Sequence, residues 1–117
     1  MACTKPQMLD RLDNTLELIA VLRAATPFEV ELQPSLMAYL RAQGVDFNLK
    51  LRHSVLKVSY GGDEGGILCH IERHDAPAAL VVSITHLRLR RSLPFAPAVL
   101  RYQQHRTKRL KEANRTL

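Results

Sequence analysis

The apolar positions near the start of the chain recur every three or four residues, the spacing that gathers side chains on one helix face. This stripe consists of Leu9, Leu12, Leu16 and Ile19. Pro27 disfavours helical geometry in the residue before it, so this first helix is predicted to begin near Thr4 and to end near residue 25. The segment 33–44 repeats the pattern more briefly and ends at a glycine, which favours a second, shorter helix.

The spacing then changes to an alternation of apolar and polar residues, which is typical of strands with one buried face. Strand-like runs cover residues 45–53, 54–60, 66–72 and 79–90. The first two runs have opposite parity, and a bulge or tight connection near His53 and Ser54 would explain the flip. The sequence leaves open whether residues 46–60 form one bent strand or two. A last helix is predicted over residues 96–113, with a polar and basic second half.

The order helix–helix–strand(strand)–strand–strand–helix, with short connections between strands, predicts an antiparallel meander of three or four strands. Helices before and after the meander would cover one face, which gives a two-layer α+β fold. A chain of 117 residues is expected to form a single domain over residues 1–117. This order is also similar to the double-stranded RNA-binding fold. That family carries its basic cluster at the start of its last helix, where this chain has LPFAPAVL.

The glycine-rich segment GGDEGG, residues 61–66, is predicted to close a hairpin, and a second turn to close the next one. The expected pairs are Leu56–Ile71, Val58–Cys69 and Tyr60–Ile67, then Ile71–Val82, Cys69–Ile84 and Ile67–His86. This register predicts a sheet-end cluster of Tyr60, Asp63, Glu64 and His86, with Arg88 and Arg90 continuing beside the two acids.

The same glycine-rich segment resembles the GGDEF signature of diguanylate cyclases, which also lies at a hairpin tip. The chain has no matching metal-binding aspartate motif upstream, and Gly65 stands where the family has an aromatic residue. A turn needs its glycines for positive φ, so a structural role is sufficient. Cys69 and His70 would point to opposite faces of a strand, which disfavours a zinc site. We therefore expect no catalytic residue, no metal and no cofactor, and the sequence favours a protein that is not an enzyme.

Charge is distributed unevenly: the formal total is +6, but residues 88–117 carry nine cations against Glu112 alone. The remaining 87 residues are therefore net acidic. Such asymmetry indicates a polyanionic or acidic partner. Arg101, Lys108 and Arg115 are seven residues apart and should share a helix face. The predicted polyanion-binding residues are Arg88, Arg90, Arg91, Arg101, Arg106, Lys108, Arg109, Lys111 and Arg115.

Three functions follow from these patterns. The first is a non-catalytic module whose basic C-terminal region contacts nucleic acid or an acidic protein. The second is a small-ligand or enzymatic site at the sheet end around GGDEGG. The third is a homo-oligomeric assembly subunit, most simply a homodimer, that uses the N-terminal helix. No apolar run approaches the ~20 residues of a membrane span. With only two cysteines far apart, a disulfide framework is not expected and the cytoplasm is the predicted compartment.

Overall fold

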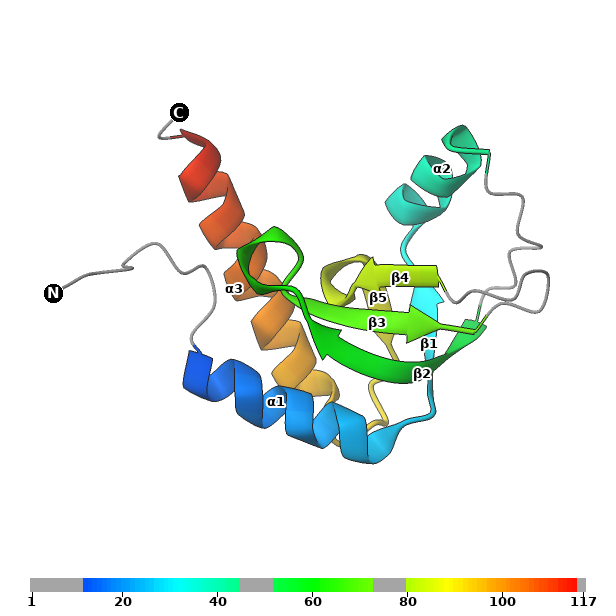
Figure 1. Cartoon of the computed structure of the whole chain (residues 1–117), viewed down its shortest axis with the longest axis vertical. Coiled ribbons are helices and arrows are strands. Elements are labelled where there is room, and N and C mark those ends of the chain that lie inside the picture. Colours follow the sequence, from blue (N-terminus) through cyan, green and yellow to red (C-terminus); the bar gives the residue numbers. More distant parts are fainter. Residues whose placement is uncertain (1–11, 45–51, 73–79, 116–117) are drawn as a thin grey trace, which may run out of the picture.

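The computed structural model describes residues 12–44, 52–72 and 80–115, which form an α+β fold with an antiparallel sheet (Figure 1). The helices are α1 (Leu12–Ala25), α2 (Pro34–Ala42) and α3 (Ala96–Arg115). The strands are β1 (Phe28–Leu32), β2 (Arg52–Tyr60), β3 (Ile67–Ile71), β4 (Leu80–Ser83) and β5 (Leu87–Leu89). Two 3₁₀ turns, η1 (Gly62–Glu64) and η2 (Ile84–His86), lie between strands. The described part therefore confirms the predicted class, the three helices, and the end of the first helix near residue 25.

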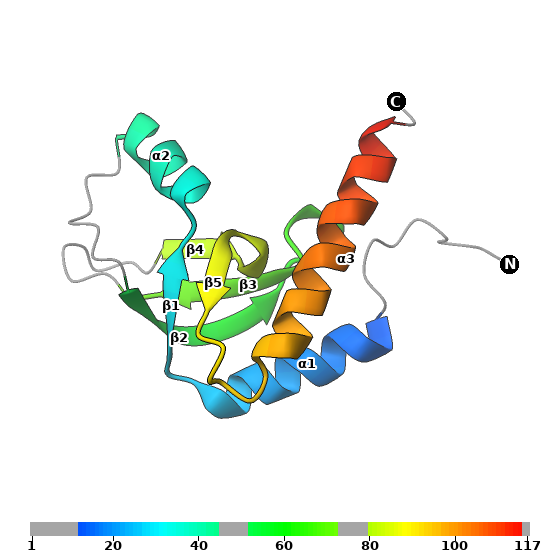
Figure 2. The same ribbon diagram turned by 180° about the vertical axis from the view of Figure 1, so that it is seen from behind.

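The sheet has five strands in the order β4-β3-β2-β1-β5, and all neighbouring pairs are antiparallel. Strands β4 and β5 follow each other in the chain but lie at opposite edges, joined only by the three residues of η2. The sheet must therefore curl until its two edges approach each other (Figure 2). The side chain of Gln103 on α3 holds the η2 turn, because its amide donates hydrogen bonds to the carbonyls of Ile84 and Leu87 at 2.7 Å each.

The prediction of three or four strands was wrong in two places. It missed β1, a five-residue strand whose buried Phe28, Val30 and Leu32 alternate with two glutamates. It also treated residues 79–90 as one strand, but the chain leaves the ladder after Ser83. There the Ser83 hydroxyl accepts a hydrogen bond from the Thr85 amide at 3.3 Å, which favours a turn over a continued strand.

The hydrophobic core lies between the inner face of the curled sheet and helices α1 and α3 (Figures 1 and 2). Helix α1 buries Leu18, Ile19 and Leu22, whereas Leu16, which the sequence pattern placed on the apolar stripe, is half exposed. Residues 4–11, with Leu9, lie outside the described part. Helix α2 projects from the opposite end of the sheet and buries Leu36 and Leu40. Because α1 packs on its own sheet, its apolar face is already used within the chain.

In the first hairpin the predicted pairs Tyr60–Ile67 and Val58–Cys69 are confirmed, but Ile71 pairs with Val55 and not with Leu56. The irregularity lies between Val55 and Lys57, later than the predicted site near His53 and Ser54. Leu56 is the extra residue there, and it is 49% exposed. One continuous strand therefore runs from Arg52 to Tyr60, while residues 46–51 lie outside the described part.

In the second hairpin the observed register differs from the predicted one by two residues. Cys69 pairs with Val82, and Ile71 pairs with Leu80. A shift of two residues keeps every side chain on its face, so the alternation of apolar residues could not detect it. The ladder ends at the pair Leu68–Ser83, and the predicted pair of Ile67 with His86 does not form.

Candidate functional site

The loop Gly61–Gly66, called the glycine loop below, is closed by its own backbone. The Gly61 amide donates to the Gly66 carbonyl and the Gly66 amide donates to the Gly62 carbonyl, both at 2.7 Å. Gly62 and Gly66 have φ angles of 68° and 67°, in the left-handed region that favours glycine. Gly62 and Gly66 therefore have the backbone role that the sequence suggested.

Helix α3 holds this loop through two side chains one turn apart. The Tyr102 hydroxyl accepts a hydrogen bond from the Ile67 amide at 3.0 Å, and Arg106 Nη2 donates to the Asp63 carbonyl at 2.6 Å. A Cβ atom at Gly66 would overlap the Tyr102 hydroxyl and lie 2.9 Å from Arg106 Nε. The glycine loop is thus a docking point for α3.

The predicted sheet-end cluster has its members on different elements. Tyr60 ends β2 and Asp63 lies in η1, whereas His86 is exposed at the end of η2. The side chain of Glu64 lies outside the described part. The cluster was predicted from a register that pairs His86 with Ile67, and this pair does not form. A shared site of these four residues stays a prediction.

The cations expected beside the glycine loop lie instead next to the acids of β1. Arg90 Nη2 is 3.2 Å from Glu29 Oε1, and Arg88 on β5 is the register partner of Glu31. Sequence reasoning placed these arginines near Asp63 because it did not include the strand that carries their nearest acids. The signal was present, since both acids of this strand alternate with buried residues.

The nine predicted polyanion-binding residues fall into groups with different surroundings. Arg106 is only 2% exposed and is used to hold the glycine loop. Arg90 and Arg109 form ion pairs with Glu29 and Glu112, and the side chain of Arg115 lies outside the described part. The remaining five are exposed and have no ion pair with any described residue: Arg88, Arg91, Arg101, Lys108 and Lys111.

Three of these cations form a line on α3, the α3 cationic stripe of Arg101, Lys108 and Lys111. Their spacings of seven and three residues place them on one side of the helix, away from buried Val99 and Tyr102. At 1.5 Å per residue the stripe is about 15 Å long. The C-terminal half of α3, which carries Lys108 and Lys111, extends beyond the sheet as a projecting arm (Figure 1).

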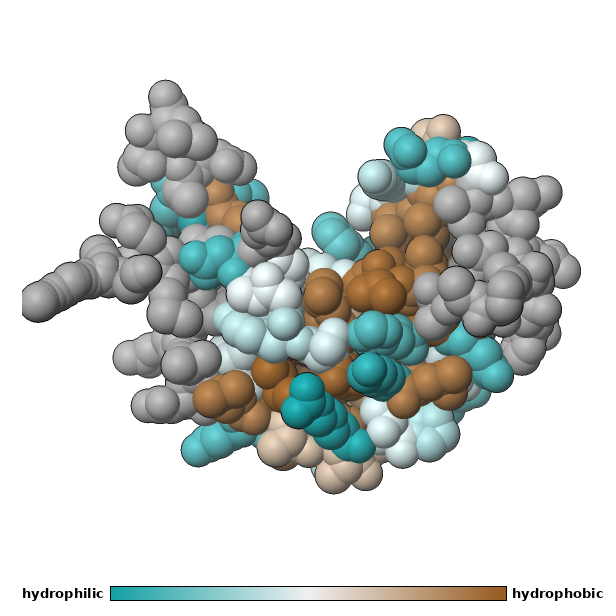
Figure 3. Space-filling model, in the orientation of Figure 1, coloured by the Kyte–Doolittle hydropathy of each residue, from teal (hydrophilic) through white to brown (hydrophobic). Residues whose placement is uncertain are grey.

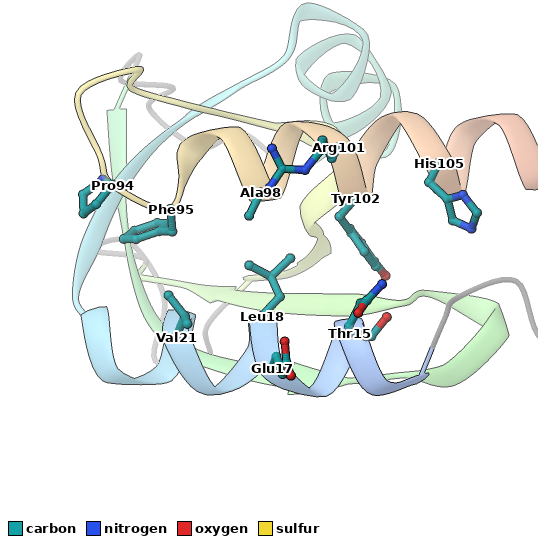
Figure 4. A pocket seen from close by; sticks show the side chains of 11 residues that line it. Thr15, Glu17, Leu18, Val21, Pro94, Phe95, Ala98, Arg101, Tyr102 and His105 are labelled. Atoms are coloured by element: carbon teal, nitrogen blue, oxygen red, sulfur yellow. The ribbon is translucent and has the colours of Figure 1, made fainter.

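A groove that the sequence did not reveal lies between α1 and α3 (Figure 4). This α1–α3 groove has a volume of about 730 Å³. Leu18 and Val21 contribute apolar surface from α1, and Phe95 and Ala98 contribute it from the other side. Its polar lining includes Glu17 on α1 and Arg101 and His105 on α3. The space-filling view shows polar and apolar side chains interspersed on one face of the molecule (Figure 3).

The described residues offer little for metal or nucleophilic chemistry. They contain no group of three or more histidine, cysteine or carboxylate side chains that could hold a metal ion. His74 and Asp75, two further residue types that bind metals, lie outside the described residues. Cys69 is fully buried, and this burial raises the pKa of its thiol to about 12, so the thiolate is scarce at neutral pH.

Comparison with protein-family models, curated proteins and solved structures finds no match to this chain. Among the described helices, none combines the length and apolar character needed to cross a membrane. The function is therefore argued below from the surfaces of the chain itself.

Proposed function

We propose that this protein is a non-catalytic module that binds the phosphate backbone of a nucleic acid through the α3 cationic stripe. The observation that carries the proposal is the line of exposed Arg101, Lys108 and Lys111, on a side of the helix whose one described acid is Glu112. The nearest acid along the helix, Glu112, is paired with Arg109. Arg90, which lies beside β1, in contrast already forms an ion pair with Glu29.

The three cations are held at fixed spacing by a helix that is already folded. Binding therefore requires no loss of backbone conformational entropy in this segment. Cations in a row suit a strand of phosphates, and contacts of this kind position a protein without reading sequence. Stacking platforms are not part of the proposal, because Phe95 and Tyr102, the aromatic residues in or next to α3, are buried in the core. We expect non-specific affinity, with a Kd of about 10⁻⁴–10⁻⁶ M at physiological salt.

The test is fluorescence anisotropy with a labelled duplex oligonucleotide over a series of salt concentrations. Three neutralised phosphates give a slope of log K against log salt of about −2.7, at roughly −0.9 per contact. The double variant Lys108→Gln/Lys111→Gln should reduce this slope by about 1.8 on the same relation. The double variant Arg41→Gln/Lys57→Gln removes the same charge from exposed positions on α2 and β2, and should leave the slope unchanged.

Equal effects of the two double variants would show that net charge, and not the stripe, drives binding. A parallel titration with polyglutamate separates the remaining partner class. If polyglutamate binds in a stripe-dependent manner and the oligonucleotide does not bind, the partner is an acidic protein and the proposal is wrong.

A further inference from the structure

We propose that the α1–α3 groove binds a small hydrophobic carboxylate, with its apolar part between the helices and its carboxylate at Arg101. The inference does not depend on nucleic-acid binding. It rests on the shape of the groove, on its apolar floor and on the arrangement of charges around it.

The groove exists because two aromatic residues hold α3 in place while a small residue stands between them. The ring of Phe95 packs edge-on against Phe28 at a centroid distance of 5.3 Å. Tyr102, two turns further along α3, is held by the Ile67 amide. Ala98 lies between them and projects only a methyl group toward α1 (Figure 4). The resulting volume of about 730 Å³ lies within the range of about 300–1,000 Å³ for small-molecule sites.

The charges that line the groove predict where an anionic group of a ligand would lie. Arg101 is exposed and forms no ion pair with a described residue, so its guanidinium is available for a carboxylate. His105, four residues further along the helix, lines the same side. The lining acid is Glu17 on the opposite wall, which would repel a carboxylate. Arg101 and Glu17 should therefore have opposite effects on an anionic ligand and no effect on a neutral one.

The experiment is an NMR titration of the ¹⁵N-labelled full chain with octanoate and, separately, with the neutral octanamide. Octanoate should shift amides of residues 14–21 and 94–105 and bind more tightly than octanamide. Arg101→Gln should weaken octanoate about tenfold, the loss expected for one charge-assisted hydrogen bond, and leave octanamide within about twofold. Glu17→Gln should tighten octanoate only.

Steric variants test the location independently of charge. Ala98→Phe fills the groove from α3 and Val21→Phe fills it from α1, so each should abolish binding of both probes. Because Val21 is 48% exposed, the chain should tolerate the larger ring at this position. Val21→Phe therefore keeps the test available if Ala98→Phe does not fold. Matched controls are Lys57→Gln, with the same charge change, and Gln104→Leu, an exposed apolar substitution; neither residue lines the groove.

Three results would overturn the inference. The first is equal binding of octanoate and octanamide, since the groove would then not select an anion. The second is binding that survives a folded filling variant. The third is an absence of saturable shifts at residues 14–21 and 94–105 in the wild-type chain.

Discussion

Replacing Gly66 with alanine tests whether α3 is docked on the glycine loop. The substitution places a side chain at a φ of 67°, which costs about 1 kcal/mol for a residue with a Cβ. The new methyl group would also displace the Tyr102 hydroxyl and leave the buried Ile67 amide without its acceptor, at a cost of about 1–3 kcal/mol. We therefore expect the free energy of unfolding to fall by about 2–4 kcal/mol.

The matched control is Gly62→Ala, because Gly62 has nearly the same φ of 68° but a Cβ atom there would meet no other atom within 4 Å. It should lose only the backbone contribution of about 1 kcal/mol. Urea unfolding followed by circular dichroism measures both losses, provided that the m-values agree. Equal destabilisation by the two substitutions would refute the docking of α3 against Gly66.

Three further predictions concern other parts of the molecule. Gln103→Leu removes both hydrogen bonds to the carbonyls of Ile84 and Leu87 and should lower the free energy of unfolding by about 1–3 kcal/mol, measured by urea unfolding; no change would mean that these bonds do not hold the turn. In a Cys3→Ser background, native Cys69 should react with a thiol reagent at pH 8 about 1,000-fold more slowly than the unfolded chain, because its pKa is raised from 9.0 to about 12. Since the folded state keeps the proton of the Cys69 thiol, the contribution of Cys69 to the free energy of unfolding is full below pH 9 and falls as the pH rises towards 12. Finally, Arg101 belongs to both the groove and the α3 cationic stripe, so saturating octanoate should weaken oligonucleotide binding, and octanamide should not; equal effects of the two would contradict a shared arginine.

The first hairpin was predictable because its information is local. Alternation fixed the buried faces, and the glycines marked the turn, which together set the pairs Tyr60–Ile67 and Val58–Cys69. The second register was not predictable, since a shift of two residues leaves the faces unchanged. Strand β1 was missed because it is short and half acidic, and because its pairing with β5 joins residues far apart in the sequence.

The sequence predicted the candidate surfaces only in part. A count of cations found the basic region of α3 but could not separate Arg106 from its neighbours. The position of Arg106 in the helical repeat could have separated it, because Val99, Tyr102 and Arg106 follow the spacing of three and four that marks a buried helix face. The α1–α3 groove depends on how two distant helices lie beside each other, and no local pattern contains that distance.

The position of β1 in the sheet bears on how the chain folds during synthesis. β1 lies between β2 and β5, so its second edge is completed only when Leu87–Leu89, much later in the chain, becomes available. Until then an N-terminal fragment exposes an unpaired strand edge, which is a template for association with other chains. Pairings between such distant segments also slow folding. A ribosome-bound chain that ends before η2 should therefore remain open and prone to aggregation, and hydrogen exchange on stalled chains would detect its unprotected β1 amides.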